Sequence, residues 1–241
     1  GLEWLRPKWK GFGSIYFKFA SKLSIILFDE IITDSIEMKK IYEKKFLKNS
    51  QTIAYGSTMN KDVNKNKIDF LKLEKYSYYL IVGRLIPDNN SELIITSFLK
   101  SFSKKKLVVV GDVPYEDNYA KKIKKMACDK IIFTGYLNCN ETLSSLYKFC
   151  FAYIHGHEFG GTNPTMINAL DFNCQILSLK TNFNIEMLVN KRVVFFEKNL
   201  KSSINSFLYF EKNYQKILKS NCKYILPKKY NWDIICTQYL N

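Results

Sequence analysis

The sequence has no apolar run that is long enough to cross a membrane as a helix. Its longest uninterrupted run, around Leu23 and Ile25–Phe28, is far shorter than the roughly 20 residues that a membrane span needs. The chain also opens without a cleavable signal pattern. Its first residue is Gly1 and not an initiator methionine, so we expect it to be a piece of a longer protein.

Several catalytic and metal-binding motifs are absent as well. No GxSxG elbow, HExxH helix or P-loop motif occurs, which argues against a serine hydrolase, a zinc protease of that type and a P-loop enzyme. Histidine is scarce: only His155 and His157 occur, separated by one glycine and without a clear third ligand. We therefore expect neither a metal ion nor a cofactor.

The cysteines form no CxxC pair, and they fall on different predicted elements. This spacing favours neither a zinc site nor a disulfide framework. We expect reduced, mostly buried thiols in a cytoplasmic protein. The cysteines concerned are Cys128, Cys139, Cys150, Cys174, Cys222 and Cys236.

Acidic residues are few: 22 Asp and Glu stand against 37 Lys and Arg, a formal charge of +15. The excess is spread along the chain, and only Lys104–Lys106 and Lys121–Lys125 are clustered. A nucleic-acid-binding surface more often gathers its charge into a stripe or an arm, so we expect no nucleic-acid partner. Attraction to an anionic membrane surface or to a phosphorylated substrate fits this charge better.

Short β-branched runs alternate with amphipathic stretches, which predicts an α/β fold. In the first part of the chain, apolar residues at three- and four-residue steps over 12–28 predict a buried helix. Three further elements follow, and then a polar, lysine-rich stretch typical of a linker begins at Asn60. The three elements are a strand at Glu30–Thr33, a helix at Ser35–Phe46 and a strand at Thr52–Tyr55.

The second part of the chain repeats the strand–helix pattern, which indicates βαβ units and a parallel sheet. Ligands of such sheets bind at the carboxyl ends of the strands. The strands are predicted at Tyr78–Val82, Leu107–Val110, Lys130–Phe133, Phe151–Ile154, Gln175–Leu179 and Val193–Phe196. The helices are predicted at Ser91–Phe102, Tyr115–Met126, Glu141–Phe149, Pro164–Phe172 and Tyr230–Leu240.

The segment from His155 to Met166, HGHEFGGTNPTM, is the strongest candidate site. Asn163 suits the N-cap of a helix, and Pro164 suits its first position. Gly160 and Gly161 leave room for a ligand close to the backbone. Free N–H groups at a helix start attract an anion such as a diphosphate, although a well-capped crossover helix explains the same residues equally well.

Two other strand ends supply residues of the same kind. Arg84 follows the strand Tyr78–Val82 and could hold phosphate oxygens through two parallel hydrogen bonds, although a surface arginine is the simpler alternative. Gly111 opens a glycine turn after Leu107–Val110. Together, the three loops strengthen the prediction of an anion site at this edge of the sheet.

At these residues the sequence resembles the retaining nucleotide-sugar glycosyltransferases of family four, in the branch of rhamnosyltransferase-type enzymes that build bacterial capsule and O-antigen chains. The matching stretches occur in family order over nearly the whole chain. They are GLEWLRPKW (1–9), FDEIITDS (28–35), VGRLIPDNN (82–90), VVVGD (108–112), IIFTGY (131–136), YIHGHEFGGTNPTMINAL (153–170), NFNIEML (182–188) and YNWD (230–233).

The resemblance implies a GT-B fold, in which two Rossmann-like lobes face each other and the second lobe holds the donor. We expect one nearly complete parallel-sheet lobe plus the tail of the other lobe. The division implied is a remnant of the acceptor-side lobe at 1–59, a linker at 60–77, the donor-binding lobe at 78–225 and a C-terminal crossover helix at 226–241.

The resemblance also assigns roles to residues. Arg84 would contact the donor diphosphate, together with Gly111, Asn163 and the backbone of Gly160, Gly161 and Thr162. His155 or His157 would face the sugar or the acceptor. No metal would be required, because a helix terminus and basic side chains neutralise the leaving group. Asn168 stands where the family usually has a glutamate that holds the ribose, and it lacks that charge.

The leading hypothesis is a hexosyltransferase, with L-rhamnosyl as the candidate sugar, that transfers from a nucleotide sugar to a polysaccharide or lipid-linked acceptor with retention. The runner-up is a non-catalytic or split donor-binding lobe that needs the missing acceptor-side lobe as a partner. The third is another nucleotide-binding α/β protein, such as an epimerase of the same two-lobed fold. A lipid-linked acceptor would place the chain at the inner face of the cytoplasmic membrane.

The N-terminal segment is the candidate for peripheral membrane contact. Leu2, Trp4, Trp9 and Phe12 alternate there with Arg6, Lys8 and Lys10, a mixture that suits a membrane interface. Burial of the same apolar residues against the missing lobe is the equally weighted alternative.

Overall fold

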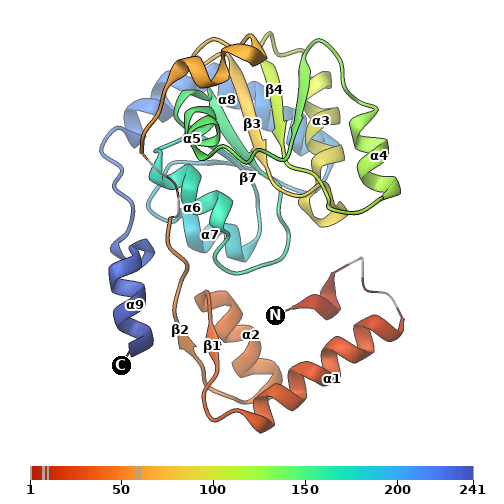
Figure 1. Ribbon diagram of the computed structural model, residues 1–241, viewed down its shortest axis with the longest axis vertical. Helices are drawn as coiled ribbons and strands as arrows, with labels where there is room; N and C mark the ends of the chain where they lie inside the picture. Colours follow the sequence, from red (N-terminus) through yellow and green to blue (C-terminus); the bar gives the residue numbers. More distant parts are fainter. Residues whose placement is uncertain (1, 7–8, 10, 58, 60, 241) are drawn as a thin grey trace.

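The computed structural model describes residues 2–6, 9, 11–57, 59 and 61–240. Figure 1 shows a large α/β lobe with a smaller part below it, formed by the first residues of the chain. The C-terminal helix α9 (Trp232–Leu240) leaves the large lobe and lies beside the smaller part. The predicted α/β class with a parallel sheet is confirmed.

The large lobe is built on a six-stranded parallel sheet in the order β5-β4-β3-β6-β7-β8. The chain starts at the centre, fills one side and then crosses to fill the other, as in Rossmann-type folds. Both faces are covered, which explains the nearly unbroken apolar strands. The strands are β3 (Tyr78–Val82), β4 (Lys106–Val110), β5 (Ile131–Gly135), β6 (Ala152–His155), β7 (Ile176–Leu179) and β8 (Val194–Phe196).

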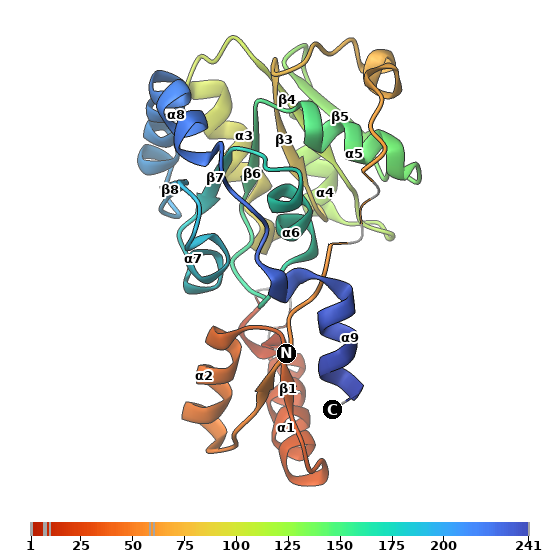
Figure 2. The ribbon, with the colours of Figure 1, turned by 90° about the vertical axis from the view of Figure 1, so that its left-hand side faces the viewer.

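Two layers of helices enclose the sheet (Figure 2). One core cluster includes side chains of α5 (Asn140–Phe149), α6 (Pro164–Asp171) and α7 (Asn182–Leu188). The other includes side chains of α3 (Ser91–Lys100), α4 (Asn118–Lys124) and α8 (Leu200–Asn221). The short helix η3 (Pro87–Asn89) leads into α3. The predicted α4 was too long, because its N-cap is Asp117 and the helix begins only after it.

The longest helix, α8, lies in a stretch without a predicted element. It packs along α3, and its Phe207 and Phe210 are buried. The ring of Tyr79 on the central strand β3 lies 5.2 Å from the ring of Phe207 and 5.9 Å from the ring of Phe98. Aromatic burial of this kind holds α3 and α8 against the sheet.

The smaller part contains η1 (Glu3–Leu5), α1 (Phe12–Leu27), β1 (Ile32–Thr33), α2 (Ile36–Phe46) and β2 (Gln51–Thr52). Its two strands pair in parallel. Its core is small and includes Phe183 from α7 of the large lobe. The other buried members of this cluster are Leu2, Trp4, Met38 and Tyr42.

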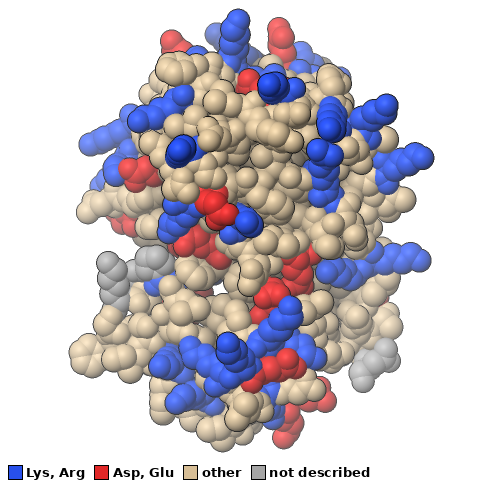
Figure 3. Space-filling model, turned by 180° about the vertical axis from the view of Figure 1, so that it is seen from behind, with Lys and Arg blue, Asp and Glu red and all other residues tan. Residues whose placement is uncertain are grey.

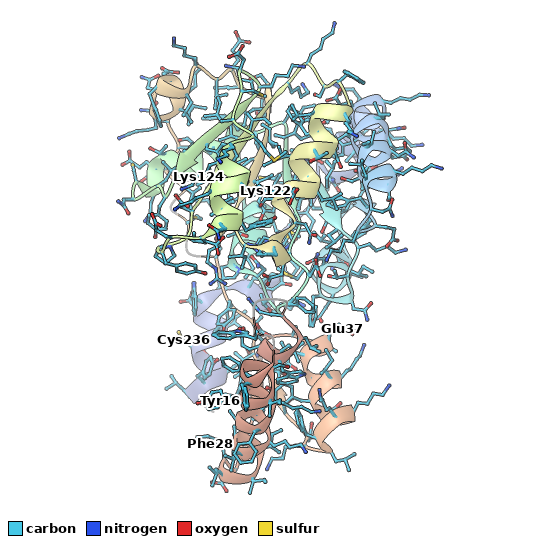
Figure 4. All side chains as sticks on the ribbon, turned by 90° about the vertical axis from the view of Figure 1, so that its right-hand side faces the viewer. Tyr16, Phe28, Glu37, Lys122, Lys124 and Cys236 are labelled. Atoms are coloured by element: carbon cyan, nitrogen blue, oxygen red, sulfur yellow. The ribbon has the colours of Figure 1, made fainter. Side chains whose placement is uncertain are left out.

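The prediction that α1 is buried is wrong. The helix forms, but none of its residues is buried, and Phe12 and Ile26 are 92% and 78% exposed. Figure 4 labels Tyr16 on this helix and Phe28 just beyond its end, both of them exposed. The apolar spacing set the helical form correctly, but α1 packs on one side only, and no layer covers its other side among the described residues.

The N-terminal segment also departs from its predicted arrangement. Leu2 and Trp4 are buried in the small core, whereas Trp9 and Phe12 are exposed. The apolar residues therefore do not form one common surface. Lys8 and Lys10, predicted to lie among them, fall outside the described residues, as does Gly1. Among the described helices, none combines the length and the apolar content of a membrane span.

All six cysteines are free in this structure, and the prediction that most of them are buried is wrong. Cys150 and Cys174 are buried where they precede β6 and β7, whereas the other four are exposed. Those four lie in connections, just beyond α8 or on α9, away from the covered faces of the sheet. The spacing of the cysteines in the sequence carries no information about that difference.

The stretch predicted as a linker contains the short helix η2 (Lys65–Leu71), which packs against α5. Ile68 is fully buried there, and Leu73 joins the same core cluster.

After α8, η4 (Lys228–Tyr230) leads to α9, whose Trp232 ring lies against Gly56. Basic side chains are distributed over both parts of the face seen in Figure 3, with acidic ones among them.

Candidate functional site

The candidate site lies where β3 and β6 pair at the centre of the sheet. The chain leaves these two neighbours toward opposite sides, because β4 lies beyond β3 and β7 lies beyond β6. This is the switch point at which parallel α/β sheets bind ligands. Arg84 follows β3, and the segment 156–163 follows β6.

Glycines let the loops at this edge approach one another closely. Gly111 has a φ of +117°, and a Cβ there would overlap the carbonyl oxygen of Gly83. A Cβ on Gly156 would likewise overlap the carbonyl oxygen of Asn89. Gly111 was predicted to contact the donor, and in the structure it packs against Gly83, the residue before Arg84.

The helix α6 begins as its sequence predicts. Asn163 has an extended backbone, and its side chain accepts a hydrogen bond from the backbone N–H of Thr165 at 3.0 Å. Pro164 occupies the first turn. Gly160, with a φ of +125°, turns the chain ahead of the helix in a conformation that favours glycine.

The glycine loop is in contact with an acidic side chain from the smaller part. A Cβ on Gly161 would overlap Oδ1 of Asp34, and the Thr162 hydroxyl donates to the backbone oxygen of Asp34. Burial raises the pKa of the Asp34 carboxyl, while a hydrogen bond from the backbone N–H of Thr162 acts in the opposite direction. The predicted anion loop thus holds a carboxyl group in this structure.

A second acidic residue connects the two parts of the molecule. The carboxylate of Glu186, on α7, accepts hydrogen bonds from the backbone N–H groups of Ile36 and Glu37, both at 2.9 Å. Ser35 caps the same helix by accepting from Met38 at 3.1 Å. Neither Asp34 nor Glu186 was predicted as a site residue, and only their position within the matching stretches 28–35 and 182–188 could have indicated them.

Arg84 is exposed at the end of β3, where its charge acts on a neighbouring histidine. Its backbone oxygen accepts a hydrogen bond from the Asn89 side chain at 2.8 Å. The side chain therefore extends from a loop whose backbone is held. This arrangement leaves the guanidinium able to bind an anion at the switch point.

The two histidines stack on each other, with ring centroids 4.4 Å apart. His155 is fully buried, and burial lowers its pKa well below the usual value. His157 is half-buried against Gly83, and burial together with the charges of Arg6 and Arg84 lowers its pKa to about 3. Both rings are therefore neutral at pH 7, and only His157 reaches the surface of the loop.

The acidic side chain of this loop is engaged elsewhere. Glu158 accepts a hydrogen bond from Asn90 at 2.8 Å and forms an ion pair with Lys198. Asn90 also donates to the backbone oxygen of Gly156 at 2.8 Å. Asp88 pairs with Arg6 at 3.4 Å. The residues after Arg84 thus support the loop after β6 by hydrogen bonds.

Asn168 is buried on α6, and its Oδ1 accepts a hydrogen bond from the Ser57 hydroxyl at 3.3 Å. Ser57 belongs to the segment that connects the smaller part with the large lobe. Asn168 therefore lies at the junction of the two parts, about one turn along α6 from the loop. Among the described residues, no three His, Cys, Asp or Glu side chains gather as a metal site would require.

Comparisons with known proteins agree with this architecture. The model of the family described as "Glycosyl transferases group 1" matches residues 62–225. No curated protein matches the sequence. The structure is similar to that of Anabaena Alr3699/HepE in complex with UDP and glucose, with a TM-score of 0.80 at 14% identity. That match covers 98% of this chain and 68% of the other.

Two further solved structures show the same fold. For a mutant of S. aureus TarM in complex with Fondaparinux, alpha-GlcNAc-glycerol and UDP, the TM-score is 0.72 at 16% identity, over 93% of this chain and 45% of that one. For a sucrose-phosphate synthase from Thermosynechococcus elongatus the TM-score is 0.73 at 13% identity, over 92% and 59%. This chain therefore spans between about half and two thirds of these proteins.

Proposed function

The chain belongs to the group 1 glycosyltransferases, and on that premise we propose that it binds a nucleoside-diphosphate sugar at the loop after β6. We further propose that it transfers a hexosyl unit, with L-rhamnosyl as the candidate, to a polysaccharide or lipid-linked oligosaccharide. The anomeric bond to the diphosphate breaks, and a bond to an acceptor hydroxyl forms with retention. The acceptor's proton leaves on the diphosphate.

The observation that carries this proposal is the carboxyl group of Asp34 on the glycine loop. The backbone N–H of Thr162 donates to it, at the start of α6. Backbone N–H groups and the helix dipole at such a position favour negative charge. A diphosphate carries more charge than one carboxylate and would replace it at the loop.

The neighbouring residues supply the remaining functions. Arg84 would pair with diphosphate oxygens and stabilise the charge that develops as the leaving group departs. The neutral His157 would donate or accept a hydrogen bond to the sugar, with Asn168 near the ribose. With these groups in place, transfer would proceed without a metal ion.

Replacing Arg84 with alanine tests the diphosphate role. Loss of a charge-assisted pair should weaken UDP binding about tenfold to a hundredfold, measured by titration calorimetry. Arg192, an exposed arginine just before the edge strand β8, provides the matched control variant. Unchanged UDP affinity in Arg84→Ala would remove this role, and a parallel series with GDP and dTDP would identify the base.

A second candidate is a donor-binding lobe that turns over only with a partner lobe on its acceptor side. Two features of the smaller part favour it. The exposed apolar side of α1 lacks a covering layer, and β1 pairs on one edge only among the described residues. Sugar transfer by this chain alone would exclude this candidate, whereas transfer only after adding an acceptor-side lobe would establish it.

Contact with the inner face of the cytoplasmic membrane is part of the same proposal, because a lipid-linked acceptor resides there. Lys18 and Lys22 flank the exposed apolar residues of α1, a pattern typical of helices that lie at an anionic interface. Co-sedimentation with anionic vesicles at low salt tests this contact. Absence of binding there would leave the partner lobe as the occupant of that surface.

A further inference from the structure

A continuous path of hydrogen bonds runs from the buried strand β6 to the start of α6. Oδ1 of Asn163 accepts from the Thr165 hydroxyl at 2.8 Å, in addition to the Thr165 backbone. The same hydroxyl lies 2.9 Å from the hydroxyl of Tyr153. Tyr153 in turn lies 3.0 Å from Nδ1 of His155. A core strand is thus connected to the cap of the donor-loop helix.

Only one direction of donation satisfies every member of this path. The Asn163 oxygen can only accept, so the single proton of the Thr165 hydroxyl is directed there. Thr165 must then accept from Tyr153, and the Tyr153 oxygen must accept from His155. It follows that His155 carries its proton on Nδ1 and that its Nε2 is an acceptor.

The surroundings of the path stabilise this single arrangement. Tyr153 and His155 are fully buried, so water does not compete for their hydrogen bonds. Burial lowers the pKa of His155 and raises that of Tyr153, so both side chains remain neutral. Within the described part of the chain, Nε2 of His155 has no hydrogen-bond partner, in agreement with the assigned tautomer.

We propose that Tyr153, His155 and Thr165 are positioning residues of the donor site. Their hydrogen-bond path holds Asn163 as the cap of α6 and thereby orients the loop N–H groups toward the diphosphate. His155 also supports His157 by stacking beneath its ring. This inference rests on the proposed function, since it concerns how the same loop is held ready for its ligand.

A matched pair of variants at Thr165 separates the hydroxyl from the shape of the side chain. Thr165→Val keeps the branched shape and breaks the path, so UDP affinity measured by calorimetry should fall about tenfold. Thr165→Ser restores the hydroxyl and should recover most of that affinity. Wild-type affinity in Thr165→Val, or equal losses in both variants, would overturn the proposal.

The tautomer of His155 provides a readout that requires no ligand. Two-dimensional ¹⁵N spectra of the imidazoles should show His155 protonated on Nδ1, with signals assigned through His157→Asn. In Tyr153→Phe, this preference should be lost, because Nδ1–H loses its acceptor. Protonation on Nε2 in the wild type would overturn the path alone, whereas a wild type that binds no nucleoside diphosphate would overturn the proposed function and with it the positioning role.

Discussion

At the glycine loop, the side chain of Asp34 and a donor diphosphate would compete for the same backbone N–H group. The Asp34 carboxyl group resembles the proposed diphosphate in charge and in position, since it lies against Gly161 and accepts a hydrogen bond from the N–H of Thr162. Donor binding should therefore require this side chain to withdraw. The smaller part of the molecule would then influence donor affinity through one residue.

Replacing Asp34 with asparagine should strengthen UDP binding about fivefold to tenfold, because the amide has no negative charge to compete with the diphosphate. The backbone oxygen that receives the Thr162 hydroxyl is retained in this variant. Calorimetry against wild type measures the change. Glu43→Gln, on the helix that follows Asp34 but paired with Lys39, is the control and should leave the affinity unchanged; weaker binding by Asp34→Asn would contradict the competition.

At the scale of elements, α2 and α7 form the joint between the two parts. Glu186 of α7 accepts hydrogen bonds from two backbone N–H groups in the first turn of α2. N–H groups at these positions have no acceptor within their own helix. A negative charge there is also favoured by the helix dipole. The joint thus depends on one carboxylate and on the small core that includes Phe183.

Removal of this carboxylate in Glu186→Ala should cost about 1.5–3 kcal/mol at the joint, the usual worth of hydrogen bonds to a charged group. Hydrogen exchange should accelerate at the amides of Ile36 and Glu37, while the amides of β3 remain protected. Glu197→Ala removes an exposed partner of Lys180 and serves as the control. Equal exchange at α2 in both variants would show that Glu186 does not hold the joint.

The attachment of α8 to the sheet can be tested in the same way. Phe207 is 1% exposed and lies among Tyr79 and Phe98, so Phe207→Ala should destabilise the protein by about 3–5 kcal/mol. Urea denaturation measures the loss. Phe102→Ala removes a ring that is 85% exposed and should change stability by less than about 0.5 kcal/mol. A small effect at Phe207 would mean that the site collapses around the cavity.

For the whole molecule, the buried His155 and the half-buried His157 make the free energy of unfolding depend on pH. Their pKa values are lower in the folded chain than in the unfolded chain, that of His157 at about 3. As the pH falls below about 6.5, the two histidines bind protons in the unfolded chain but not in the folded chain. Their contribution to stability is therefore fully present above that pH and is lost as the pH decreases toward their folded pKa values.

Below about pH 6, His157 should contribute a slope of about 1.4 kcal/mol per pH unit to the free energy of unfolding until the pH approaches its folded pKa of about 3, and His155 adds to the slope in the same direction. Urea denaturation at half-unit steps measures the slope. In His157→Asn, one titrating group is gone, and the slope should decrease by about 1.4 kcal/mol per pH unit. An unchanged slope in this variant would show that His157 is protonated in the folded chain.

Features with a local cause were predictable from the sequence alone. The strand–helix alternation identified the parallel sheet, because the apolar period reports which faces of each element are covered. The Asn163–Pro164 pair placed the start of α6 correctly, since capping depends on adjacent residues. The roles assigned to Arg84, Gly160 and His157 remain predictions, although the fold brings these residues to one edge of the sheet.

Only the tertiary structure decided what covers each apolar face and which distant residues meet. The spacing in α1 predicted a helix correctly, but its outer side is exposed because periodicity does not identify the facing layer. Asp34 reaches Thr162 and Glu186 reaches the start of α2 across more than a hundred positions of sequence, through the folding of separate elements onto each other. The tautomer of His155 likewise follows from neighbours that only the fold brings within hydrogen-bond distance.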